Sequence, residues 1–332
     1  LSVLSTRPAG EDGYLLLRLL PGRELLERGA QPRNLLLVLD TSGSMEGLKL
    51  QQARAAALRV VESLGEEDRF GLLTYAAGLR WLSEGLEAVD EAARRRVLSA
   101  VEDLDAGGGT NIEAALDEAL AEVERSGHDG PTYLLFLSDG LPTVGERDVH
   151  LLLERARRAR EKRIRIFTFG VGPDVDTALM DGLATGSRAL SRYVLPGEDL
   201  SECVGSLAAQ ISQPLLTELR LELEGAGIHD LEPAGMGDLF RGDELVILAR
   251  YAHPGSRLLH LQGLHRGRPW RMESTLQLAS RAGEHAWLPR LWAVRRIASL
   301  QRELRRGGSE DPEVVEEIVA LGLRHGIVTP YT

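Results

Sequence analysis

The sequence predicts an α/β protein in which a doubly wound, mostly parallel sheet is inserted in or followed by an antiparallel β-sandwich, with helices at the C-terminal end. Between residues 31 and 212, apolar runs of strand length alternate with helix patterns, which is typical of a parallel sheet with helices on both faces. After Pro214, strand-like runs follow one another between Gly- and Pro-rich turns, which is typical of an antiparallel sheet. Two amphipathic helix patterns then close the chain.

The chain therefore divides into four predicted regions. Residues 1–30 contain one strand, over 14–20, and a polar linker, and we expect the strand to pair with the β-sandwich. The α/β domain covers residues 31–212 and the β-sandwich covers 213–288. Residues 289–332 are predicted to form a helical segment and a final strand.

The elements of the α/β domain follow from the spacing of apolar residues. Continuous apolar runs predict buried strands at 34–39, 69–75, 132–138 and 164–169, with a weaker strand at 190–195 and a short edge strand at 79–83. Apolar residues three and four positions apart predict helices at about 50–64, 97–104, 112–123, 147–162 and 199–211. In sheets of this kind, ligands bind at the carboxyl ends of the strands.

The C-terminal part of the chain shows the second pattern. Strands are predicted at 215–224, 244–251, 257–265 and 269–278, and helices at 288–306 and 312–324. The last seven residues, 326–332, are predicted as a strand.

Composition excludes several functional classes. The net charge of -11 argues against binding to nucleic acid or to an anionic membrane. Cys203 is the only cysteine, so an intrachain disulfide is excluded, and no apolar run is long enough to predict a membrane-spanning helix. Lys49 and Lys162 are the only lysines among the 39 basic residues, which we interpret as a matter of composition. Because the sequence begins at Leu1 and not at Met, we expect it to be a fragment.

The most informative motif is Asp40-Thr41-Ser42-Gly43-Ser44, which directly follows the first buried strand of the α/β domain. One carboxylate and two alternating hydroxyl groups on a tight turn offer three hard oxygen donors. Such donors suit Mg²⁺ or Ca²⁺, whereas thiolates and imidazoles suit other metals.

Two further loops are expected at the same edge of the sheet. Three glycines lead into Thr110 at the start of a helix, and Asp139 follows another buried strand. If these strands are neighbours, the loops converge on one ion, and the predicted metal ligands are Asp40, Ser42, Ser44, Thr110 and Asp139. The predicted ion is Mg²⁺, with Mn²⁺ or Ca²⁺ as alternatives. Two carboxylates and three hydroxyls leave water in the coordination shell of such an ion, so a partner's carboxylate can take its place.

Other interpretations of these motifs are weaker. Asp and Ser are favoured at a strand–helix turn, so the first motif alone could be a helix cap. The glycine loop lacks the lysine of a nucleotide-binding P-loop. An aspartic protease needs two carboxylates sharing a proton in an all-β fold, and a serine nucleophile needs a nearby histidine base. Only His128 and His150 lie in the α/β domain, and neither follows a predicted strand.

The order Asp-x-Ser-x-Ser, then a Gly-Thr loop, then Ser-Asp-Gly resembles the von Willebrand factor type A domain and its metal-ion-dependent adhesion site. This resemblance covers residues 33 to about 212. It implies a Rossmann-like fold in which the three hydroxyl residues are direct or near-direct ligands. The two aspartates would bind directly or through water.

The rest of the chain is similar to the inter-alpha-trypsin inhibitor heavy chains and their bacterial relatives. The similar segments are Glu11-Asp12-Gly13-Tyr14, Asp238-Leu239-Phe240-Arg241-Gly242, Leu291-Trp292-Ala293 with Arg295-Arg296-Ile297, and Gly326-Ile327-Val328-Thr329-Pro330-Tyr331-Thr332. Two departures matter. The N-terminal all-β domain of that family is missing or trimmed to residues 1–20. The Asp-Pro-His motif for covalent ester attachment is absent, so that activity is not implied.

We therefore expect a non-enzymatic, Mg²⁺-dependent protein-binding or adhesion module whose partner supplies an Asp or Glu carboxylate. One alternative is a cognate subunit of an AAA+ ATPase machine, against which the extra β region argues. A metal-dependent hydrolase comes last, since no general base is evident. The resemblance favours an extracellular, cell-surface or periplasmic location, with the cytoplasm as the alternative.

Overall fold

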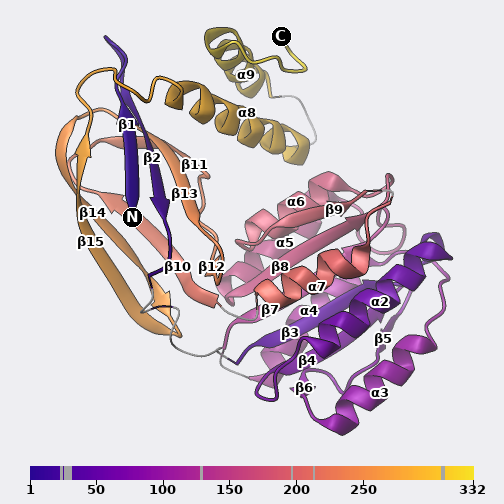
Figure 1. Cartoon of the computed structure of the whole chain (residues 1–332). Coiled ribbons are helices and arrows are strands. Elements are labelled where there is room, and N and C mark those ends of the chain that lie inside the picture. The colour runs from indigo at the N-terminus through magenta and orange to yellow at the C-terminus, as the bar shows by residue number, and fades with distance from the viewer. Residues whose placement is uncertain (23–24, 26–31, 128–129, 196, 212–213, 308–310) are drawn as a thin grey trace. The chain divides into compact units, whose positions relative to one another are not determined.

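The chain folds as two compact units, which are described separately (Figure 1). A computed structural model describes residues 1–22, 25, 32–127, 130–195, 197–211, 214–307 and 311–332. One unit comprises Ala30–Gln213, and the other combines Leu1–Gly29 with Pro214–Thr332. We call them the α/β unit and the β unit.

A seven-stranded sheet forms the centre of the α/β unit. Its order is β5-β4-β3-β7-β8-β9, with β6 also paired to β4. Five strands are parallel, namely β3 (Asn34–Asp40), β4 (Arg69–Tyr75), β7 (Thr132–Ser138), β8 (Ile164–Val171) and β9 (Ser191–Val194). The antiparallel strands are β5 (Leu79–Trp81) and β6 (Glu87–Ala88). Every residue of β3, β7 and β8 is buried, as expected for central strands covered on both faces.

Six α-helices of the α/β unit lie in two groups on the sheet (Figure 1). They are α2 (Leu48–Glu62), α3 (Glu91–Glu102), α4 (Ile112–Ser126), α5 (Val149–Glu161), α6 (Thr177–Gly186) and α7 (Leu200–Gln210). Helices α3 and α7 pack against α2, whereas α4, α5 and α6 pack against one another and share a core with the strands. Four of these helices begin at an Asp whose side chain accepts a backbone N–H, a strong helix-start signal.

The two ends of the α/β unit are joined through Arg33, which is 1% exposed. Its Nη1 donates to the carbonyl of Ala208 in α7 over 2.6 Å, and its Nε lies 3.3 Å from Asp68 Oδ2. Burial lowers the pKa of Arg33, and the Asp68 carboxylate opposes that shift. The hydrogen bond to Ala208 therefore links the residues just before β3 to the last helix of the unit, and the buried ion pair with Asp68 holds the guanidinium in place.

The β unit contains two four-stranded antiparallel sheets that form a sandwich. The first sheet has the order β1 (Ser2–Thr6), β2 (Gly13–Leu19), β13 (Leu245–Tyr251) and β11 (Ile228–Glu232). The second has the order β12 (Leu239–Phe240), β10 (Pro214–Leu223), β14 (Gly255–His265) and β15 (Arg268–Leu278). Leucines from both sheets share one apolar core, as in sheets packed face to face.

Two helices, α8 (Leu288–Gly307) and α9 (Pro312–His325), complete the β unit. Trp292 of α8 is buried, and its Nε1 donates to the carbonyl of Asp230 over 2.9 Å. Its ring lies edge-on to that of Tyr14, with 5.5 Å between the centroids. The guanidinium of Arg250 lies 5.3 Å from the Tyr14 ring centre and 5.6 Å from that of Trp292. These contacts hold α8 on the first sheet.

The predicted α/β fold class is confirmed, but several elements were wrong or missed. Residues 326–332 do not form a strand, because they turn back onto α9, where Ile327 N donates to Gly322 O over 2.9 Å. The sequence patterns also missed β1, β6, β11, β12 and α6. Among the described helices, none has the length and apolar character needed to cross a membrane.

Candidate metal centre

The candidate centre lies at the carboxyl ends of β3 and β7, which are neighbours in the sheet. Asp40, the last residue of β3, is fully buried. Its Oδ1 accepts a hydrogen bond from the backbone N–H of Ser42 over 2.8 Å, and its Oδ2 accepts one from Ser138 Oγ over 2.9 Å. Asp40 is therefore fixed both by its own turn and by the adjacent strand.

Hydrogen bonds join Ser42 and Ser44 to the second aspartate. A one-turn 3₁₀ helix, η1 (Gly43–Met45), follows β3 and places the two serine hydroxyls 3.1 Å apart. Ser44 Oγ donates to Asp139 Oδ1 over 2.7 Å, and Asp139 is fully buried. The structure thus brings four of the five predicted residues into one continuous network.

The fifth predicted residue, Thr110, lies in a loop that is tied to this turn through the backbone. Gly43 N donates to Gly108 O over 3.1 Å, and Gly107 N donates to Thr41 O over 2.9 Å. Gly108 has φ of +80°, a conformation that favours glycine. Thr110 is buried, and its own N–H donates to Thr143 Oγ1 over 2.8 Å. The three loops therefore converge at one sheet edge, as the strand order requires.

The electrostatics of the centre favour a cation. Burial raises the pKa of the Asp40 carboxyl above its ordinary value, hydrogen bonds from Ser42 and Ser138 act in the opposite direction, and the neighbouring Asp139 raises it further. Burial also raises the pKa of Tyr75 well above its ordinary value, with Asp40 contributing. Two buried carboxylates side by side are unfavourable unless positive charge lies close to them.

Sequence reasoning missed one residue of the centre that supplies such charge. Lys49 Nζ lies 2.5 Å from Asp139 Oδ2, so composition alone does not explain this lysine. Its rarity in an arginine-rich chain was the available signal. The sequence also gives no sign that Ser138 is a partner of Asp40, because the two residues meet only where β3 and β7 pair.

The donor set fits a hard divalent cation. Within the described ranges, no group of three or more His, Cys, Asp or Glu side chains is arranged to hold a metal ion, so hydroxyl oxygens would have to complete any site here. The two aspartates and the serine hydroxyls provide oxygen donors alone, which suits Mg²⁺. The lysine ammonium on Asp139 shows that this carboxylate accommodates a cation.

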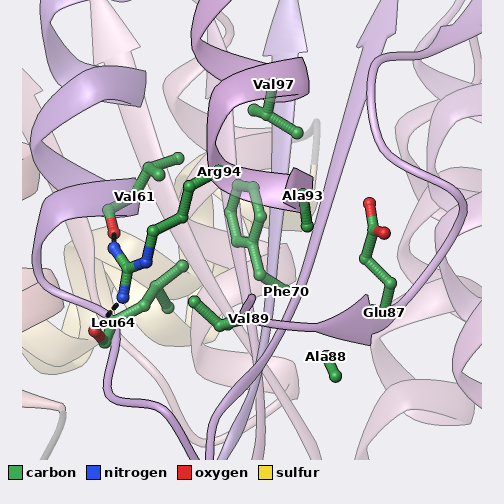
Figure 2. A pocket seen from close by; sticks show the side chains of 9 residues that line it. All are labelled: Val61, Leu64, Phe70, Glu87, Ala88, Val89, Ala93, Arg94 and Val97. Carbon is green, nitrogen blue, oxygen red and sulfur yellow. Dashed lines mark hydrogen bonds between the residues drawn. The ribbon is translucent and has the colours of Figure 1, made fainter. Parts of the chain in front are cut away.

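A small cavity elsewhere in the α/β unit does not offer a ligand site (Figure 2). It lies beside the end of α2 and has a volume of about 10 Å³, which is room for about one water molecule. Its lining is mostly apolar, and Arg94 at its edge donates to the carbonyls of Val61 and Leu64 over 2.6 Å each. Arg94 thereby caps the C-terminal end of α2, which is a structural role.

Comparison with known proteins identifies the family of the α/β unit and a set of relatives. The sequence profile of the von Willebrand factor type A domain matches residues 34–207. Inter-alpha-trypsin inhibitor heavy chain H4 of Sus scrofa is 27% identical over 325 residues, which cover 91% of this chain and 34% of that protein. The chain thus spans about a third of the length of the curated relatives that it matches.

Two solved structures share the fold over nearly the whole chain. A von Willebrand factor type A protein from Catenulispora acidiphila superposes with a TM-score of 0.67 at 15% identity, covering 98% of this chain and 86% of that one. The ArnB paralog VWA2 from Sulfolobus acidocaldarius gives a TM-score of 0.58 at 17% identity, with coverage of 98% and 90%. At these identities the likeness concerns the fold alone.

Proposed function

The chain belongs to the von Willebrand factor type A domain family, and from this premise we propose that it is a protein-binding module that captures a partner's carboxylate at a Mg²⁺ site. The observation that carries the proposal is the hydrogen-bonded group of Asp40, Ser42, Ser44 and Asp139 at the carboxyl edge of the sheet. Its donors are all oxygens, and two of them are buried carboxylates.

The hydroxyls of Ser42, Ser44 and Thr110 would be direct or near-direct ligands of the ion, and Asp40 and Asp139 would hold it directly or through water. When bound, Mg²⁺ supplies coordination positions at which a carboxylate oxygen can replace water. The protein's own contribution is positional: the strand end and η1 fix the donors before any ligand arrives. Little conformational entropy then remains to be lost on binding.

The surroundings of the centre favour a protein partner. Leu48 follows the serine turn and is 68% exposed, and Leu141 follows Asp139 and is 57% exposed. Two exposed leucines beside a polar site suit a partner that offers apolar side chains next to its carboxylate. The net charge of -11 disfavours nucleic acid as that partner.

Isothermal titration calorimetry with Mg²⁺ tests the metal-binding step. Wild type should bind, and Asp40→Asn should lose binding by at least about tenfold, because a ligand charge is removed while the side-chain shape is kept. Glu67→Gln, at an exposed position in the turn between α2 and β4, removes a carboxylate charge at the opposite end of the strands and should bind like wild type. Equal heats from wild type and Asp40→Asn would reject the proposal.

A further inference from the structure

Lys49 contacts the candidate metal centre through Asp139 and passes beside Gly172. Its ammonium lies 2.5 Å from Asp139 Oδ2, and its side chain is 30% exposed, whereas that of Asp139 is fully buried. Asp139 Oδ1 already accepts the hydroxyl of Ser44 over 2.7 Å. A Cβ atom at Gly172, which follows β8, would come within 3.4 Å of Lys49 Cε and 3.5 Å of its Nζ. The lysine therefore extends past a glycine to reach the carboxylate.

The position of Lys49 in its helix is unfavourable for a cation. It is the second residue of α2, and the N-terminus of a helix repels positive charge. The N-cap residue of α2 is Gly47, and no side chain caps the helix there. A lysine at this position is explained by its ion pair with Asp139, and not by the stability of the helix.

Lysine and arginine would also act differently at this point. Lysine carries a compact point charge on a flexible stem, whereas arginine presents a broad planar fork. All but two of the chain's 39 basic residues are arginines, so a lysine beside a candidate ligand is an exception to the composition of the whole chain. A compact charge can yield its place next to a carboxylate to an incoming ion without leaving the centre.

We propose that Lys49 is an internal counter-ion of the metal centre, which weakens Mg²⁺ binding and strengthens the capture of a carboxylate. This inference rests on the proposed function. Without metal, the ammonium neutralises Asp139 and keeps it in position. With a divalent ion bound to two aspartates, the lysine gives the centre a net charge of about +1, and without the lysine that charge would be about zero. A positive centre attracts an anionic group, whereas the same charge repels the metal ion.

The charge argument predicts two shifts of opposite sign in Lys49→Gln. Mg²⁺ should bind at least about tenfold more tightly, because a unit charge no longer opposes a divalent ion a few ångströms away. Acetate should bind the Mn²⁺-loaded variant at least about threefold more weakly than it binds the loaded wild type, since the net charge is lost. A purely structural role for Lys49 would weaken both interactions together.

Calorimetry measures the dissociation constant for Mg²⁺. For acetate, the Mn²⁺-loaded protein is titrated and binding is monitored through the relaxation of water protons. Lys49→Arg keeps the charge and should stay closer to wild type than Lys49→Gln does in both assays. Lys162→Gln, which removes the other lysine at an ion pair with Glu124, is the control and should change neither constant.

Each result of these titrations discriminates. Tighter Mg²⁺ binding together with weaker acetate binding in Lys49→Gln supports the inference. If wild type binds Mg²⁺ and Lys49→Gln has the same two dissociation constants, or if both constants shift in the same direction, the inference is overturned. The proposed function then still stands. If Lys49→Gln binds Mg²⁺ and wild type does not, the result supports the inhibitory role of the lysine and overturns the proposed function of the native chain. Absence of Mg²⁺ binding in both proteins overturns both.

Discussion

Asp40→Asn should stabilise the metal-free protein at neutral pH. Burial raises the pKa of this carboxyl, so the folded protein holds the proton more tightly than the unfolded chain does. The stability that Asp40 contributes is therefore present below its ordinary pKa and is lost as the pH rises through the raised value. An amide of the same shape carries no charge. In the presence of a chelator at pH 7, Asp40→Asn should therefore not lose this stability, and it should unfold at a higher temperature than wild type.

Magnesium should stabilise wild type more than it stabilises Asp40→Asn. A ligand at a hundred times its dissociation constant stabilises the folded state by about 2.7 kcal/mol. The α/β unit, Ala30–Gln213, falls in the size range in which 1 kcal/mol moves the unfolding midpoint by about 2–4 °C. At a Mg²⁺ concentration a hundred times the wild-type dissociation constant, the wild-type midpoint should rise by about 5–11 °C, and that of Asp40→Asn by at most about half as much.

Differential scanning calorimetry in chelator and in Mg²⁺, repeated between pH 4 and pH 8, measures both effects. Glu67→Gln should follow wild type throughout, because that residue is exposed in the turn before β4, at the opposite end of the strands from the centre. The reasoning would be refuted by a variant that gains the same midpoint shift from Mg²⁺ as wild type. It would also be refuted if Asp40→Asn were less stable than wild type in chelator at pH 7.

Three further substitutions test the contacts that support the two units. Asp68→Ala leaves the Arg33 guanidinium buried without its carboxylate and should destabilise the α/β unit by about 3–5 kcal/mol in urea unfolding; a loss under 1 kcal/mol would contradict this. Trp292→Ala empties a buried site on the first sheet and should destabilise the β unit by about 3–5 kcal/mol, measured in the same way. Gly13→Ala would place a Cβ 2.0 Å from the Tyr251 ring, so we expect the free energy of unfolding to fall by about 1–3 kcal/mol and the thermal midpoint to fall with it. An unchanged midpoint would show that the ring can move.

Sequence reasoning predicted the parts of the fold whose patterns are strong. The strands β3, β7 and β8 are continuous apolar runs, and the structure buries every residue of them. Helix α6 was missed because glycines interrupt it, and glycine is a poor helix former. Gly182 is tolerated there because the helix packs closely, with Leu153 of α5 within 2.4 Å of where a Cβ would lie. Such a contact is tertiary and leaves no local signal.

The same contrast applies to the candidate centre. Asp40, Ser42 and Ser44 were found together because one turn carries them, and Asp139 was found because it follows a buried strand. Distances across the sheet edge assign Lys49 and Ser138 to the centre, at 2.5 Å and 2.9 Å from Asp139 and Asp40 respectively. Residue type and spacing show which groups can bind a cation, whereas the partners that balance their charge depend on how separate loops meet.

The hydrogen bond from Arg33 to the carbonyl of Ala208 has a consequence for the order in which the protein folds. Gly13 of β2 pairs with Tyr251 of β13, so the sandwich is complete only after the whole α/β unit has been synthesised between them. Once folded, the α/β unit holds its two ends together through Arg33, which shortens the effective loop between β2 and β13. The shorter loop lowers the entropic barrier to this pairing by on the order of 1–2 kcal/mol. Folding of the α/β unit thus favours completion of the β unit. A variant in which Arg33 no longer binds Ala208 should slow the pairing of β2 with β13.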